Sequence, residues 1–164
     1  INISVKSDES SDPFHRMIAG ILQKTCEMTA FLNPSENSYA RFGSYKAPIY
    51  VSWSRENRSQ LVRIPAAEGE YRRAELRSPD PEANPYLAFA LMIYAGLYGL
   101  ENRLDLPEPA DINLYTADEK MLTNFCRLPK DLAAARAAAF SSDFIRKHIP
   151  AAVLEVYCGK KSDR

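Results

Sequence analysis

The sequence predicts an α+β fold in which antiparallel strands pack on a buried central helix and a helical cap follows at the C-terminal end. Three observations favour this class. Short β-rich stretches alternate with turn residues between positions 48 and 77, an apolar segment runs from 84 to 100, and three short helical stretches follow position 131. The chain has 164 residues, enough for one domain with its own core.

The first predicted elements are a strand and a helix. Ile1 and Ile3 alternate like the end of a strand. Pro13 after an aspartate is a helix-start signal, and apolar residues then recur with a helical period as far as Phe31. The stretch 33–47 has no period and is rich in turn formers, so it predicts a long loop, a feature that is usually functional or disordered.

The stretches PIYVSW, LVRIP and YRRAELR predict neighbouring antiparallel strands. Because strand side chains alternate, Arg73, Glu75 and Arg77 are expected on one face, with Ala74 and Leu76 packing in the core on the other.

The central helix is predicted to begin after Asn84, which with Pro85 makes a good N-cap and first-turn pair. It is apolar almost all round to about Leu100, which predicts a buried helix. After a proline-rich connector, helical stretches near 131–140, 143–148 and 151–157 are expected to form the cap.

Overall charge and cysteine content narrow the class of protein. The 21 basic and 21 acidic residues cancel, so no global attraction for nucleic acid or a membrane surface is expected. The apolar run 86–100 is too short to span a bilayer. Cys26, Cys126 and Cys158 are odd in number and lack metal-type spacing, which favours structural, reduced thiols in a cytoplasmic protein.

Positive charge is concentrated locally. Seven of the thirteen arginines lie between positions 41 and 77, with Lys46 as the single lysine and four glutamates. Arginine favours two-pronged recognition of phosphate or carboxylate. Within this region Glu75, between two arginines, is either a salt-bridged structural acid or a Mg²⁺ ligand beside bound anions, and spacing alone does not decide between these hypotheses.

Five motifs, NPSENSYARF, YKAP, NRSQLVRIP, RRAELRSPDPEANPYLAFA and AGLYGL, occur in an order that resembles the C-terminal part of the glutamine synthetase catalytic domain. The resemblance implies ATP-dependent ligation of ammonia to glutamate through γ-glutamyl phosphate, with ATP and Mg²⁺ as cofactors. It also implies a ring-shaped homo-oligomer in the cytoplasm and a role in nitrogen metabolism and glutamine biosynthesis.

The resemblance assigns roles to individual residues. Glu75 corresponds to a Mg²⁺ ligand, and Arg58 to the residue that stabilises charge on the transferred phosphoryl group. The expected glutamate-binding residues are Arg41 and Arg77, and the expected ATP-binding residues are Arg63, Arg73 and Ser4. Tyr115 matches a tyrosine that some bacterial relatives adenylylate. His15 and His148 have no neighbouring nucleophile motif, which disfavours a hydrolase.

Two departures from the family pattern affect the expected function. Lys46 stands where the family usually has a glutamate that helps to deprotonate ammonium, so an alternative is a γ-glutamyl ligase acting on another small amine. Other metal ligands and the N-terminal β-grasp domain of the family are absent from residues 1–164, which therefore resemble a partial catalytic domain that is inactive in isolation. A non-catalytic anion-binding relative is the remaining alternative.

Overall fold

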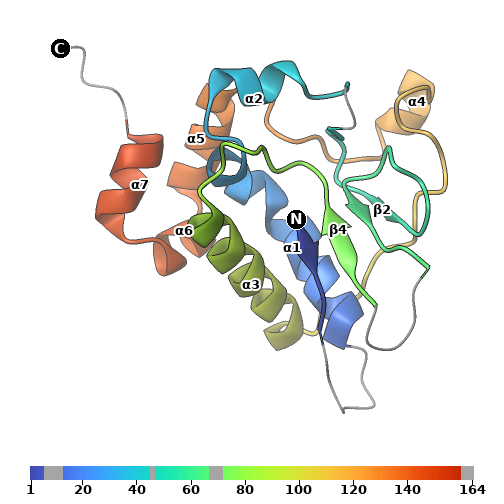
Figure 1. Cartoon of the computed structure of the whole chain (residues 1–164), viewed down its shortest axis with the longest axis horizontal. Coiled ribbons are helices and arrows are strands. Elements are labelled where there is room, and N and C mark those ends of the chain that lie inside the picture. Colours follow the sequence, from blue (N-terminus) through green and yellow to red (C-terminus); the bar gives the residue numbers. More distant parts are fainter. Residues whose placement is uncertain (6–12, 45–46, 67–71, 160–164) are drawn as a thin grey trace.

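The computed structural model describes residues 1–5, 13–44, 47–66 and 72–159. The elements in chain order are β1 (Asn2–Ile3), α1 (Pro13–Leu32), α2 (Glu36–Ala40), β2 (Trp53–Ser54), β3 (Val62–Arg63), β4 (Ala74–Leu76), α3 (Pro85–Glu101), α4 (Glu119–Leu122), α5 (Leu132–Ser141), α6 (Asp143–His148) and α7 (Ala151–Cys158). Helices α1 and α3 lie side by side, with the sheet on one side and α5 to α7 on the other (Figure 1). The α+β class is confirmed.

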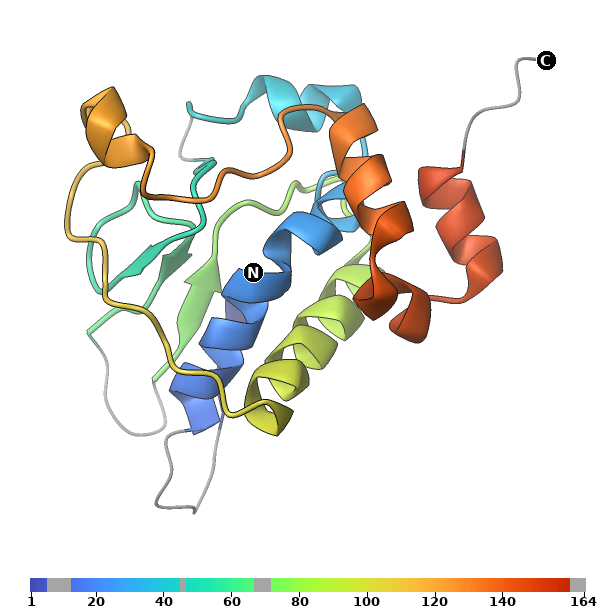
Figure 2. The same ribbon diagram turned by 180° about the vertical axis from the view of Figure 1, so that it is seen from behind.

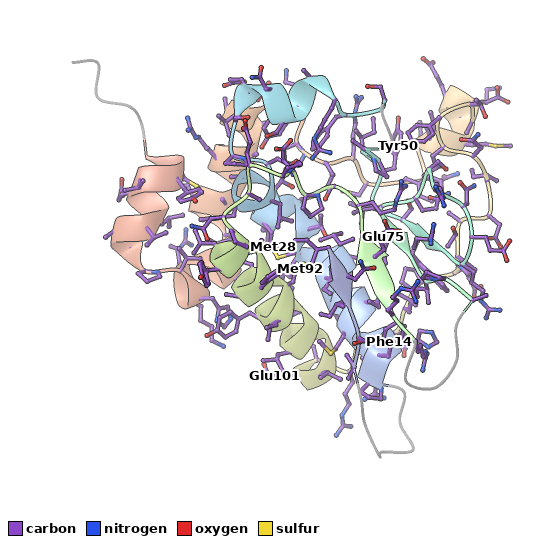
Figure 3. All side chains as sticks on the ribbon, in the orientation of Figure 1. Phe14, Met28, Tyr50, Glu75, Met92 and Glu101 are labelled. Carbon is purple, nitrogen blue, oxygen red and sulfur yellow. The ribbon has the colours of Figure 1, made fainter. Side chains whose placement is uncertain are left out.

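Helix α1 is the centre of the core. It lies between the sheet and α3 when the molecule is seen from behind (Figure 2). Its apolar side chains, from Phe14 through Ile18 to Phe31, are almost fully buried, and Met28 faces the same core as Met92 of α3 (Figure 3). Burial of these side chains supplies the main favourable free energy for the fold.

The contact between α1 and α3 depends on glycine. A Cβ atom on Gly20 would collide with the backbone of Ala95 and Gly99, and one on Gly99 would collide with the carbonyl oxygen of Arg16. The two helix backbones therefore touch directly at this point. Such an approach is open only to a residue without a side chain.

The sheet has the order β1-β4-β3-β2, and its two central strands are antiparallel as predicted. Strand β1 also pairs antiparallel with β4, at the edge of the sheet. The prediction is wrong for β2, which pairs with β3 in parallel. Residues 55–61 do not form a hairpin, and the chain before β2 pairs instead with a later segment through a Tyr50–Arg127 bridge.

Helix α3 begins where predicted, because the Asn84 side chain accepts hydrogen bonds from the backbone N–H groups of Tyr86 and Leu87 at 3.0 and 3.3 Å. The prediction of burial all round is wrong. Its inner face packs on α1, but Tyr86 is 84% exposed and Phe89 is 50% exposed on the other side. The hydrophobic composition of this helix did not reveal that the described residues leave Tyr86, Phe89 and Ile93 exposed.

The predicted C-terminal helical cap is confirmed, whereas the stretch 33–47 differs from the predicted loop. Helices α5, α6 and α7 lie close to the predicted ranges, and Asp131 and Ser142 cap the first two by accepting hydrogen bonds from backbone N–H groups. The stretch 33–47, expected to be a loop, contains α2, whose Tyr39 is buried. Within the described part of the chain, no helix has the length and apolar character needed to cross a membrane.

The direct backbone contact predicts that Gly20→Ala is strongly destabilising. The added methyl group would force α1 and α3 apart, and we expect a loss of about 2–4 kcal/mol in the free energy of unfolding. Chemical denaturation measures this loss. Gly96→Ala is the matched control, because the atoms nearest to a Cβ there belong to the Met17 side chain, whose end can move. Equal stability of the two variants would contradict the packing account.

Candidate functional site

Glu75 and the arginines around it form the candidate site. In the β3–β4 pair Arg63 lies directly opposite Glu75, while Val62 lies opposite Leu76 and both are buried. The predicted alternation on β4 is thus confirmed, with apolar side chains on the core face and charged ones on the other. Figure 3 shows Glu75 on β4, beside β1.

The Glu75 carboxylate is held loosely. Its Oε2 atom lies 3.5 Å from Nε of Arg63 and 3.9 Å from Nε of Arg77. Both distances exceed the usual range of an N–H···O hydrogen bond, so neither arginine locks the carboxylate by a tight bond. The Glu75 side chain is also 34% exposed. This geometry leaves carboxylate oxygens accessible to another cation.

Arg77 is the most buried charged group of the cluster, with a side chain only 7% exposed. Burial lowers the pKa of its guanidinium, and the positive charges of Arg63 and Arg58 act in the same direction, whereas Glu75 and Tyr115 oppose them. Within the described residues, no acceptor bonds its buried Nη1 atom. A buried donor without an acceptor is costly, so this atom is suited to an anion from outside the described part.

Arg58 lies in the turn between β2 and β3, and that turn is fastened by the polar residues beside it. The side-chain amides of Asn57 and Gln60 both donate to the carbonyl oxygen of Ile112, at 2.8 and 2.7 Å. The hydroxyl oxygen of Ser59 accepts from the backbone N–H of Leu114 at 2.9 Å. These contacts join the arginine turn to the segment that carries Tyr115.

Asn57, Ser59 and Gln60 hold the arginine turn in place, a contribution that residue-by-residue reasoning missed. The motif NRSQLVRIP contributed to the family resemblance, but no role was assigned to its uncharged polar members. Short polar side chains in a turn are a signal for local backbone bonding. Their partner lies more than fifty positions away, and no local pattern identifies it.

Arg73 and Ser4 lie at neighbouring strand ends. Asn2 pairs with Glu75 and Ile3 with Ala74, so the same register continued by one residue puts Ser4 opposite Arg73. Both residues are exposed. The two positions assigned to ATP binding by resemblance therefore share one end of the β1–β4 pair.

Arg41 has a different environment. Its Nε atom lies 2.8 Å from Oδ2 of Asp80, and Nη2 donates to Oδ1 of Asn33 at 2.7 Å and to the backbone oxygen of Ser78. These bonds tie the end of α2 to the end of α1 and to the turn after β4. The structure thus gives Arg41 a structural role, and its assignment to glutamate binding stays a prediction.

Of the two remaining predicted positions, Tyr115 and Lys46, the first lines a small hollow. Tyr115 is 41% exposed, and burial raises the pKa of its hydroxyl while the nearby Arg77 cation lowers it. Together with Gly43, Tyr50 and Leu122 it lines a cavity of about 200 Å³. Lys46 lies outside the described residues; the adjacent Ser44 and Ala47 are joined by a backbone hydrogen bond of 2.9 Å.

The described residues do not make a magnesium site by themselves. No three histidine, cysteine, aspartate or glutamate side chains of this part come together as potential metal ligands. Within the cluster of Glu75 and its arginines, Glu75 contributes one carboxylate, whereas Mg²⁺ takes six ligands in a near-octahedral arrangement. Any metal ion bound here therefore needs ligands from elsewhere.

The arrangement defines a class of protein: an α+β segment whose sheet presents an arginine-rich face. Comparison with known families is consistent with that class, because the family model "Glutamine synthetase, catalytic domain" matches residues 2–163. Glutamine synthetase of Methanosarcina mazei is 43% identical over 150 residues, covering 89% of this chain and 34% of that protein. That of Staphylococcus epidermidis is 38% identical over 155 residues, covering 93% and 35%. The chain belongs to the glutamine synthetase family.

Solved structures agree with this assignment. A GmaS in complex with ADP aligns with a TM-score of 0.76 at 31% identity, over 90% of this chain and 35% of that one. An apo GmaS without ligand aligns with a TM-score of 0.77 at the same 31% identity, over 93% and 35%. The chain thus spans about a third of the length of its relatives.

The cluster predicts that phosphate stabilises the protein. Inorganic phosphate is expected to raise the melting temperature in a concentration-dependent way, because it adds acceptors for the guanidinium groups of Arg58, Arg63 and Arg77. Differential scanning fluorimetry measures the shift. Arg63→Gln should reduce it at least about threefold, whereas Arg55→Gln, which removes an exposed arginine of the same region, should leave it unchanged. Equal shifts in both variants would contradict a localised site.

Proposed function

We propose that this chain forms the substrate-facing C-terminal part of the catalytic domain of an ATP-dependent glutamate–ammonia ligase. Its product is glutamine, and its place is in nitrogen metabolism. Family membership supports the reaction class. The observation that carries the proposal is the buried Nη1 atom of Arg77, which has no acceptor in the described part of the chain and lies in an arginine-rich cluster.

The proposed reaction has two steps, each balanced. An oxygen of the glutamate γ-carboxylate attacks the γ-phosphorus of ATP, the bond to the bridging oxygen breaks, and ADP leaves. The nitrogen of ammonia then attacks the acyl carbon of γ-glutamyl phosphate, the C–O bond to phosphate breaks, and a proton passes to a base. Inorganic phosphate and glutamine are the products.

In this proposal each arginine would bind or stabilise a different negatively charged group of the reaction. Arg77 would bind a glutamate oxygen through Nη1, and burial would strengthen that bond by excluding water. Arg58, in its fastened turn, would stabilise the phosphoryl group during transfer, a task that suits a fixed guanidinium. Arg63 and Arg73 would hold the phosphates of the nucleotide.

Further site assignments are also proposals. Ser4 would lie near the nucleotide base, Arg41 would be a second glutamate anchor, and Glu75 would be one ligand of a divalent metal ion, normally Mg²⁺. The loose contacts of Glu75 with its arginines support a metal-ligand role over a purely structural ion pair. A solved relative bound to ADP supports nucleotide binding in this family.

Assembly, location and regulation follow the family in this proposal. The complete protein would be a ring-shaped homo-oligomer, with residues 1–164 as part of its catalytic domain. Three free cysteines support a cytoplasmic location. Tyr115 would be an acceptor for adenylylation, and its position near Arg77 supports an effect of that modification on the site.

Steady-state kinetics tests the proposed ligase. In a longer protein that carries this chain with the family's preceding segments, Arg77→Gln should raise KM for glutamate about 10- to 100-fold, because it removes a charge-assisted hydrogen bond. Arg55→Gln should leave KM unchanged. The chain alone should release no glutamine above background. An unaltered KM in Arg77→Gln would remove the glutamate-binding role.

A second candidate is a γ-glutamyl ligase for another small amine, and Lys46 is the observation that favours it. A cation where the family usually has a glutamate would repel ammonium and supply no proton acceptor. We therefore expect Lys46→Glu in the longer protein to raise the ammonium-dependent rate several-fold relative to the rate with methylamine. Rates measured with both amines decide between the two acceptors. An unchanged ratio would show that Lys46 does not select the amine.

A further inference from the structure

Two cysteines that are a hundred positions apart meet on the surface of α1. The Sγ atoms of Cys26, in the second half of α1, and Cys126, after α4, lie 3.9 Å apart. Both thiols are free, and both contact the backbone oxygen of Arg127, at 3.7 and 3.8 Å. The sequence pattern predicts three structural thiols without disulfide partners. In the fold, however, Cys26 and Cys126 are neighbours.

The distance between the two sulfur atoms is close to what a covalent bond requires. A disulfide has an S–S length of about 2.05 Å, so the sulfurs would need to approach by roughly 1.9 Å. Rotation of the two side chains about their Cα–Cβ bonds moves sulfur atoms over this range. Cys158 is buried in α7 and lies outside the pair.

The two thiols differ in access to solvent. Cys126 is exposed, whereas Cys26 is partly buried. Burial, followed by the neighbouring Cys126 and Glu27, raises the pKa of the Cys26 thiol to about 12. Because a thiolate is the attacking species, Cys126 is the group that meets a reagent from solvent first.

We propose that Cys26 and Cys126 are a redox modification site, which forms a reversible intramolecular disulfide by exchange with a small disulfide such as oxidised glutathione. The pair supplies both the entering thiol and the resolving thiol. This inference does not rest on the proposed ligase function.

The exchange takes place in two balanced steps. The Cys126 thiolate attacks one sulfur of the small disulfide, the S–S bond breaks, and one small thiolate leaves. The Cys26 thiolate then attacks the Cys126 sulfur of the mixed disulfide, and the second small thiol leaves. Two protein thiols are oxidised and one small disulfide is reduced to two thiols. Capping of Cys126 also removes one of the groups that disfavour ionisation of Cys26.

The bond would connect α1 to the wall of the hollow beside Tyr115. The N–H of Val51 donates to the backbone oxygen of Cys126, and the N–H of Leu128 donates to that of Ile49, both at 2.8 Å. Ile49 and Tyr50 line the hollow. A disulfide would therefore join this two-stranded contact covalently to the central helix and limit its motion.

Mass spectrometry of the purified protein tests the proposal. After incubation with oxidised glutathione, alkylation of free thiols and digestion without reductant, we expect a peptide pair linked through Cys26 and Cys126, lighter by two hydrogen atoms and released by dithiothreitol. Cys158→Ala should give the same linked pair. In Cys26→Ser the glutathione adduct on Cys126 should persist, because no resolving thiol remains.

The single-cysteine variants also test the order of attack. Adduct formation on Cys26 in Cys126→Ser should be at least about tenfold slower than on Cys126 in Cys26→Ser, because Cys126 is exposed and burial disfavours the Cys26 thiolate. Stable glutathione adducts on both cysteines of the unaltered protein, without a linked peptide, would overturn the proposal. So would links that contain Cys158 or that join two molecules.

Discussion

The antiparallel register of β3 and β4 is the constraint on which the site depends. Val62 and Leu76 pair on the face that packs in the core, so Arg63 and Glu75 must pair on the opposite face. A slip of one residue would bury a guanidinium and a carboxylate and expose two apolar side chains. The hydrophobic core therefore fixes the position of the charged cluster, because a shifted register would be strongly destabilised.

Segments distant in the chain complete this cluster. The turn after β2 supplies Arg58, and its hydrogen bonds to Ile112 and Leu114 bring the Tyr115 segment toward Arg77. The indole N–H of Trp53 also donates to the backbone oxygen of Pro107 at 2.6 Å, which fastens the same connector further upstream. A proline-rich stretch without regular structure is thus held against the sheet by side chains.

Local patterns predicted much of this structure. Helix caps, helical periods and strand alternation were sufficient for α1, the start of α3, the three C-terminal helices and the charged face of β4. They failed where the decisive partner lies far along the chain. The parallel β2–β3 pair depends on bonds to residues 107–128, and the exposed face of α3 depends on which neighbours that helix has.

The same distinction applies to the candidate site. Family resemblance identified the charged residues, and strand alternation correctly grouped Glu75 with Arg77. Neither identified Asn57, Ser59 and Gln60 as the groups that fasten the arginine turn, nor the bonds that engage Arg41 with Asp80 and Asn33. The sequence also could not show that the buried Nη1 atom of Arg77 has no acceptor among the described residues. That property depends on every residue packed around the guanidinium.

The central claim is that Nη1 of Arg77 receives an anionic ligand, and a crystal structure of the protein with glutamate and ADP tests it most directly. The decisive quantity is the distance from this nitrogen to the nearest ligand oxygen. The account predicts a ligand carboxylate or phosphate oxygen at about 2.7–3.2 Å from it, with Arg63 and Glu75 still opposite one another. A structure in which both ligands bind elsewhere, while Nη1 bonds a protein acceptor, would contradict the account.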